Sequence, residues 1–259
     1  YYISDVDKRI ELYIMGISFI VLVLLIARKN GLKALFALIV TIAFIIKIFI
    51  PAIYNGYSPI FFAIITTIFS SLVTIYFTVG MNKKFVVALL GVTSGVLIAG
   101  ILSYIFTYRM RLNGFLDSDL LASAYLLKNV KIKELIPAGV IIGSLGAVMD
   151  VAVSITSSIN ELHETDPNMS KKSMFKSAIN IGNDIIGTMI NTLILAYIAS
   201  SIFTLLLIYI QANEYPLIRI LNFQDIAVEI MRSICGSIGI LIAVPLTAYI
   251  GTMIYKKNK

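Results

Sequence analysis

The chain has 259 residues, of which 59% are apolar and only 14% charged, and its mean hydropathy is +0.93. Globular proteins carry about 45–50% apolar and roughly 25% charged residues. This composition excludes a water-soluble domain, because there are too few charges to cover its surface, and we expect a lipid-embedded protein. A single Cys and a single His argue against disulfides within the chain and against a metal site, so neither a metal nor a cofactor is predicted. Membrane topology explains the net charge of +7 better than nucleic-acid binding does.

The start of the chain carries no targeting pattern. Tyr1 rather than Met comes first, and the charged residues Asp5, Asp7, Lys8 and Arg9 follow it without a signal-peptide arrangement. We therefore expect a processed or truncated chain that other residues precede in the whole protein.

Seven stretches are long and apolar enough to cross a bilayer, for which a helix needs about 20 residues. They cover residues 11–27, 32–50, 58–79, 85–108, 135–158, 181–209 and 226–255. We predict an all-α integral membrane fold with about seven transmembrane helices in one domain, residues 1–259. Within it, residues 11–108 form four scaffold spans, residues 109–134 an interfacial segment, and residues 135–255 three spans with polar faces.

Two segments outside the spans have the pattern of amphipathic helices at the membrane surface. In residues 109–134, Leu116, Leu120 and Leu127 recur at helical spacing among charged residues. After Pro167, Ser170 can cap a helix with an apolar side and lysines near the lipid headgroups. The alternative for this second segment is a solvated connector.

The distribution of basic residues predicts the orientation. With the N-terminus outside, a small majority of the 21 Lys and Arg residues fall in segments on the inner side, where positive charge is favoured. We therefore predict a multi-pass protein of the cell membrane with its C-terminus in the cytoplasm.

The fifth span carries a stripe of small and polar residues. Its members recur at steps of three or four, so a helix places them on one face. They are Gly139, Gly143, Gly146, Asp150, Ser154, Ser157 and Glu161. The glycines in its first half predict close helix packing.

Asp150 is the residue of this stripe that requires an explanation. It lies a turn or two from the bilayer centre, where Asp costs about 2.5–3.5 kcal/mol on an insertion scale. It needs a partner, a proton or water, and its charge can change with its surroundings, as a proton carrier requires. The alternative is a protonated Asp that only hydrogen-bonds a neighbouring helix.

The sixth span has a similar face, which contains Asn180, Asp184, Gly187, Thr188, Asn191 and Thr192. At 1.5 Å per residue, Asn191 reaches the depth of Asp150, whereas Asp184 lies roughly 10 Å nearer the cytoplasm. We predict Asn191 as the hydrogen-bond partner of Asp150. Asp184 either extends a polar path inward past Ser154 or is an interfacial charge.

The seventh span places Asp225, Glu229, Arg232 and Gly236 on one stripe. Glu229 and Arg232 stand at i and i+3, so they form either a local ion pair or the outer mouth of the polar path. Gly187 and Gly236 are the predicted packing glycines of the last two spans.

Three runs of sequence resemble the YibE/F family of bacterial membrane proteins, and the resemblance covers nearly the whole chain. They are residues 143–154 followed by 159–162, residues 173–197, and residues 232–239 with 244–247, which include Arg232, Gly236 and Pro245. The resemblance implies a multispanning protein of the bacterial cell membrane, and it brings no settled activity.

The last three spans also look like half of the membrane region of RND transporters and of the SecD and SecF translocation proteins. In those proteins an acidic group at the position matched by Asp150 belongs to the proton path. RND pumps carry two such halves and large external domains, whereas this chain has one half and only a seven-residue connection at 51–57. The likeness therefore implies a homodimer or a complex with a paralogous membrane partner.

Our leading hypothesis is a proton-coupled transporter or translocation component. Its proton or transport path would comprise Asp150, Asn191, Asp184, Ser154, Glu229 and Arg232. The alternative is a non-transporting scaffold that binds another membrane protein through its small and polar helix faces. An intramembrane enzyme ranks third, because no nucleophile or metal accompanies the carboxyls, and we predict that the protein is not an enzyme.

Overall fold

The computed structural model describes residues 9–114, 129–211 and 216–255, and this part of the chain is helical, without strands. Its elements are α1 (Arg9–Phe44), a π-helical segment (Ile45–Phe49), α2 (Ile50–Tyr54), α3 (Pro59–Val79), α4 (Lys83–Arg109), α6 (Ile132–Thr165), α7 (Lys171–Ser200), α8 (Ile202–Gln211), α9 (Leu217–Leu221) and α10 (Gln224–Tyr255). Six helices within the described ranges are long and apolar enough to span a membrane: Arg9–Tyr54, α3, α4, α6, α7 and α10.

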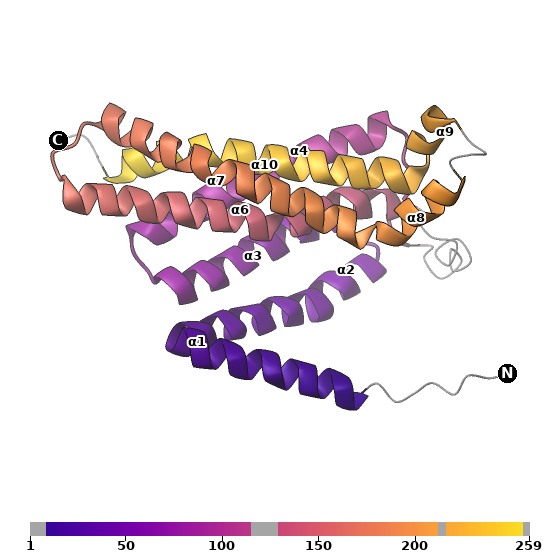
Figure 1. Ribbon diagram of the computed structural model, residues 1–259, viewed down its shortest axis with the longest axis horizontal. Coiled ribbons are helices and arrows are strands. Elements are labelled where there is room, and N and C mark those ends of the chain that lie inside the picture. Colours follow the sequence, from indigo (N-terminus) through magenta and orange to yellow (C-terminus); the bar gives the residue numbers. More distant parts are fainter. Residues whose placement is uncertain (1–8, 115–128, 212–215, 256–259) are drawn as a thin grey trace.

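The first of these six contains two predicted spans, residues 11–27 and 32–50. Its backbone leaves helical geometry at Arg28, with φ 48° and ψ −127°. Figure 1 shows α1 turning back on itself, so that its two arms form a hairpin. A Cβ on Gly31 would lie 2.7 Å from the carbonyl oxygen of Val23, so the turn requires glycine. Because this kinked helix counts once among the six, the total of about seven spans stays a prediction.

Four other predicted spans correspond to α3, α4, α6 and α10. The bounds of α3, α4 and α10 agree within two residues, whereas α6 begins three residues earlier than predicted and ends seven residues later. Side-chain caps fix the beginnings of two of them. Ser58 Oγ accepts from Phe61 N at 3.4 Å before α3, and Asn82 Oδ1 accepts from Phe85 N at 3.1 Å before α4.

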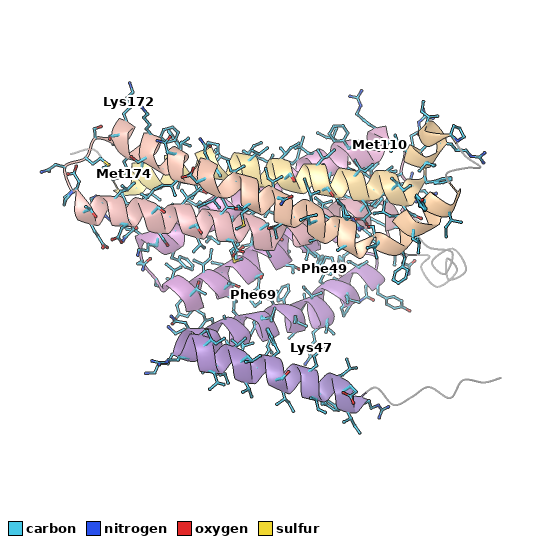
Figure 2. The ribbon with its side chains drawn as sticks, in the orientation of Figure 1. Lys47, Phe49, Phe69, Met110, Lys172 and Met174 are labelled. Carbon is cyan, nitrogen blue, oxygen red and sulfur yellow. The ribbon has the colours of Figure 1, made fainter. Side chains whose placement is uncertain are left out.

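The sixth span differs from the prediction at both ends. The cap is confirmed, since Ser170 Oγ accepts from Ser173 N at 3.1 Å. The prediction of a separate surface helix is wrong, because α7 continues without interruption from Lys171 to Ser200. Its apolar side is buried against the protein core through Met174 and Ala178 rather than in lipid headgroups, while Lys172 is exposed (Figure 2). Beyond Ser201 the chain forms the separate helix α8.

The other predicted amphipathic helix, with Leu116, Leu120 and Leu127, lies outside the described residues. Among the described residues, Ser58 at the start of α3 donates to Glu134 Oε2 at the start of α6 at 2.5 Å. This bond holds α3 and α6 together at one end of the bundle.

The long helices run between two ends of the molecule (Figure 1). The Asp166 end holds the Arg28 turn, the α3–α4 connection, the α6–α7 connection and the end of α10. The Asn55 end holds the start of α1, the α2–α3 connection, the end of α4, the start of α6, and α8 and α9. Neither name implies a side of the membrane.

The core lies where α4, α6 and α10 cross. Gly95 of α4 marks the closest approach, because a Cβ there would lie 2.8 Å from Ala243 Cβ, 2.8 Å from Val148 Cγ1 and 2.9 Å from the carbonyl oxygen of Gly239. The α1 hairpin packs on α3 at the edge of the bundle, where Phe44 stacks on Phe69 with ring centroids 4.2 Å apart. Although α4 is one of the four predicted scaffold spans, it belongs to the core.

Candidate functional site: a polar face on α6 and α7

A narrow exposed stripe runs along α6, although most of this helix is buried. The exposed residues are Gly139, Gly143, Gly146, Asp150, Ser157 and Glu161. Their buried neighbours include Val148, Val151 and Ile155. The stripe from Gly139 to Glu161 extends about 33 Å along the helix, the thickness of a bilayer core. Asp150 stands near the middle of α6, with Ser154 half-buried one turn beyond it.

The exposed side of α7 is polar as well, and α6 and α7 are in contact (Figure 1). It carries Asn180, Asn183, Asp184, Gly187, Thr188, Asn191 and Thr192. The opposite side of α7 packs into the bundle through Gly182 and Leu193. We call the two exposed stripes together the polar face.

Contacts between the antiparallel helices α6 and α7 give the relative depth of the predicted residues. A Cβ on Gly182 would lie 3.4 Å from Ile155 Cδ1, and one on Gly143 would lie 2.9 Å from the Tyr197 hydroxyl. Counting along both helices from these two contacts places Asp150 level with residues 187–190. Asn191 is therefore near the depth of Asp150, as expected, and Asp184 lies nearer the Asp166 end.

The carboxyl and carboxamide groups of the polar face have no side-chain partner in the part of the chain that the structure describes. Within the described ranges, Asp150, Asp184 and Asn191 make neither a hydrogen bond nor an ion pair. The hydroxyls differ, because Thr188 donates to Ile185 O and Thr192 to Thr188 O, each at 2.8 Å. The predicted Asp150–Asn191 bond is thus not formed in this arrangement, and their pairing stays a prediction.

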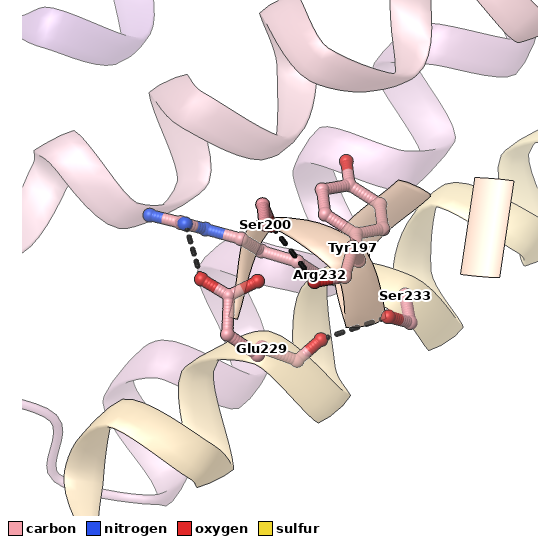
Figure 3. Close-up of polar contacts among 5 residues, drawn as sticks. All are labelled: Tyr197, Ser200, Glu229, Arg232 and Ser233. Atoms are coloured by element: carbon pink, nitrogen blue, oxygen red, sulfur yellow. Dashed lines mark hydrogen bonds and ion pairs between the residues drawn. The ribbon is translucent and has the colours of Figure 1, made fainter. Parts of the chain in front are cut away.

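The local ion pair predicted on α10 is confirmed. Arg232 Nη1 donates to Glu229 Oε1 at 2.7 Å, and both side chains are about one quarter exposed, at 24% and 25%. Figure 3 shows Tyr197 of α7 beside this pair. The ends of the Arg232 and Tyr197 side chains lie near the glycines of α6. The Tyr197 hydroxyl lies near Gly143, and Arg232 Nη2 would lie 3.7 Å from a Cβ on Gly139. These three side chains, the outer cluster, meet the polar face nearest the Asn55 end.

The outer cluster contains polar atoms without a hydrogen-bond partner. The Tyr197 hydroxyl, Glu229 Oε2 and Arg232 Nε are all buried and unpaired within the described part of the molecule. Tyr197 and Glu229 also line an open pocket of about 290 Å³ between α7, α8 and α10. The rest of its lining consists of apolar residues together with Ser201, Asp225 and Ser233. The sequence did not point to Tyr197, because only its contact across two helices gives it a place in the site.

The Glu229–Arg232 pair should show energetic coupling. We expect Glu229→Gln and Arg232→Gln each to lower stability, and the double variant to lose less than the sum, with a coupling of about 1 kcal/mol. The physical reason is that each single change leaves one charge without its counterion. Thermal unfolding of the four proteins, followed by circular dichroism, measures the coupling. Additive losses would show that the pair contributes nothing.

The predicted packing glycines fall into two groups. Gly236 is buried, and a Cβ on it would lie 2.9 Å from Leu193 Cδ2. In contrast, a Cβ on Gly146 or Gly187 would meet nothing within 4 Å, and Gly139 and Gly143 face only side-chain tips. These four glycines therefore form no backbone contact with another helix of the described chain.

The described ranges contain no group of three or more His, Cys, Asp or Glu residues that could hold a metal ion.

The helices and their composition define an all-helical membrane protein with several apolar spans and chargeable side chains at mid-span. Residues 15–257 match the family model described as YibE/F-like protein, and the chain belongs to this family. None of the curated proteins and none of the solved structures matches the chain. The YibE/F resemblance is thus confirmed, whereas the similarity to RND transporters and to SecD and SecF stays a hypothesis.

Proposed function

We propose that this protein is a proton-coupled transporter or translocation component in which Asp150 takes up and releases the proton. The observation that carries the proposal is the position of Asp150, near the middle of a spanning helix and exposed on the polar face, with no cation paired to it within the described residues. A permanent ion pair would hold the carboxylate charged. Without one, its charge responds to whether water or an apolar group covers it.

The rest of the polar face supports a path for protons through the membrane. Ser157, Glu161 and Asp184 lead from Asp150 toward the Asp166 end. The outer cluster lies toward the Asn55 end, where its unpaired buried atoms require water or a polar partner. We assign the Asp166 end to the cytoplasm, because basic residues are favoured on that side. The Arg28 turn and the α3–α4 and α6–α7 connections, all at this end (Figure 1), carry or adjoin Arg28, Lys29, Lys33, Lys83, Lys84, Lys171, Lys172 and Lys176.

The polar face is one-sided, and we propose that another membrane protein completes it. Polar groups inside membranes face a bundle interior or a water-filled cavity rather than lipid. The competing function, a scaffold without transport, uses the same contact and needs no change in the charge of Asp150. In this proposal the protein is not an enzyme.

Reconstitution can test transport even though the substrate is unidentified. Proteoliposomes are loaded with a mixed pool of ions and metabolites, a pH gradient is imposed, and released solutes are measured by mass spectrometry while a dye reports internal pH. We expect the protein to move protons together with at least one solute. Flux no greater than that of protein-free liposomes, from correctly folded protein, would favour the scaffold.

A further inference from the structure

We propose that a second copy of this chain docks on the polar face of α6 and α7. The two copies would be related by a two-fold axis along the membrane normal, with the two Asp150 residues at equal depth. This inference rests on the site of the proposed function and names its partner, but it does not depend on transport.

Lipid alone is a poor cover for the polar face. Asp150, Asp184 and Asn191 point away from the bundle without a hydrogen bond in the described structure. Hydrocarbon offers them no donor or acceptor, so they require another polar surface at the same depth. The exposed parts of α4 differ, because they present apolar residues such as Leu90 and Ile101. The exposed parts of α4 therefore do not share the requirement for a polar partner that the polar face has.

A second copy fits because it matches the polar face level by level. Two copies inserted in the same direction are related by rotation about the membrane normal, which keeps every residue at its own depth. Asp150 of one copy then lies at nearly the same depth as Asn191 of the other copy. A carboxyl group and a carboxamide group at the same depth can form hydrogen bonds with each other. A partner of different sequence would need to repeat this order of polar groups along its own helices.

The glycines provide the room for such an approach. Gly146 lies one turn before Asp150, and Gly187 lies at its level on α7. A Cβ on either would meet nothing within 4 Å among the described residues. Small residues that alternate with polar ones allow close contact between membrane helices and hydrogen bonds across it. The space beside Asp150 is thus open where a facing helix would enter.

Cysteine cross-linking tests the proposed face, since the chain has one native cysteine and Cys235 is buried. In a Cys235→Ala background, Gly146→Cys and Gly187→Cys are introduced separately and oxidised in native membranes. We expect both to give a band at twice the 28.6 kDa chain mass. Leu90→Cys is the matched control, because it is exposed on α4 outside the polar face, and it should stay monomeric.

Three results would overturn the inference. They are equal cross-linking of the Leu90→Cys control, no cross-linking of either glycine variant in folded protein, and adducts whose mass corresponds to a different protein. Circular dichroism and gel filtration of each variant establish folding before the gels are interpreted.

A mass measurement separates the assembly from the transport proposal. In lipid nanodiscs we expect particles with two chains for the wild type and for Asp150→Asn, because asparagine can still hydrogen-bond. Gly146→Leu should yield single chains, because leucine fills the gap between the copies. Two chains without flux would leave this inference standing and overturn the proposed function. Flux from single chains would do the reverse.

Discussion

Replacing Asp150 by Asn should abolish flux driven by a pH gradient, lowering it to the level of protein-free liposomes, while the protein still folds. Asparagine has nearly the same size and keeps the hydrogen-bonding capacity, but it cannot bind and release a proton. Asp150 is exposed and makes no bond within the described chain, so no native contact is lost. The proteoliposome assay measures the flux, and circular dichroism with gel filtration confirms the fold.

Glu161→Gln is the matched control for this experiment. It makes the same change from carboxyl to carboxamide on the same exposed stripe of α6, about 16 Å nearer the Asp166 end. We expect Glu161→Gln to reduce the flux much less than Asp150→Asn does. Glu161 lies close to the end of the helix, where water can carry the proton in place of its carboxyl group. Wild-type flux in the folded Asp150→Asn protein would refute the proton-carrier role of this residue.

The second large effect is expected at Gly95, in the core rather than at the polar face. Gly95→Leu should destabilise the protein by more than about 3 kcal/mol, beyond the usual range for overpacking. Already the first side-chain carbon would meet Ala243, Val148 and the backbone oxygen of Gly239 within 3 Å. Backbone cannot move aside as a flexible side chain does, so α4 and α10 must separate. Thermal unfolding in detergent, followed by circular dichroism, measures the loss.

Gly146→Leu provides the comparison, because it makes the same substitution where no atom of the chain stands within 4 Å. In a detergent that keeps the chain monomeric, its stability should equal or exceed that of the wild type. Glycine in the middle of a helix is less favourable than alanine by about 0.5–1 kcal/mol. If both variants lost the same stability, the distinction between buried and open glycines would be wrong.

Several structural features were predictable because they depend on local physics. Hydropathy alone located α3, α4, α6 and α10, because a span must satisfy its backbone polar groups within its own helix. The cap at Ser170 and the ion pair between Glu229 and Arg232 were predictable too, since both partners lie within a few residues. Contacts between distant segments, such as Tyr197 over Gly143, had no local signal.

The surface helix expected after Pro167 shows where such reasoning fails. A stripe containing Met174 and Ala178 looks the same whether lipid headgroups or protein cover it. The sequence itself contains no information on which of the two is adjacent, and here the bundle covers both residues completely.

The sequence by itself determined a membrane protein of helices, and it placed Asp150 in a stripe on one of them, because composition and the 3.6-residue period need no tertiary information. Only the tertiary structure decided which stripes are buried. Packing buries Gly91 and Gly95 of α4 against α10 and leaves Gly146, Asp150 and Gly187 on the surface. The physical reason is that burial depends on which helices are neighbours, and that follows from the packing of the whole bundle rather than from any one helix.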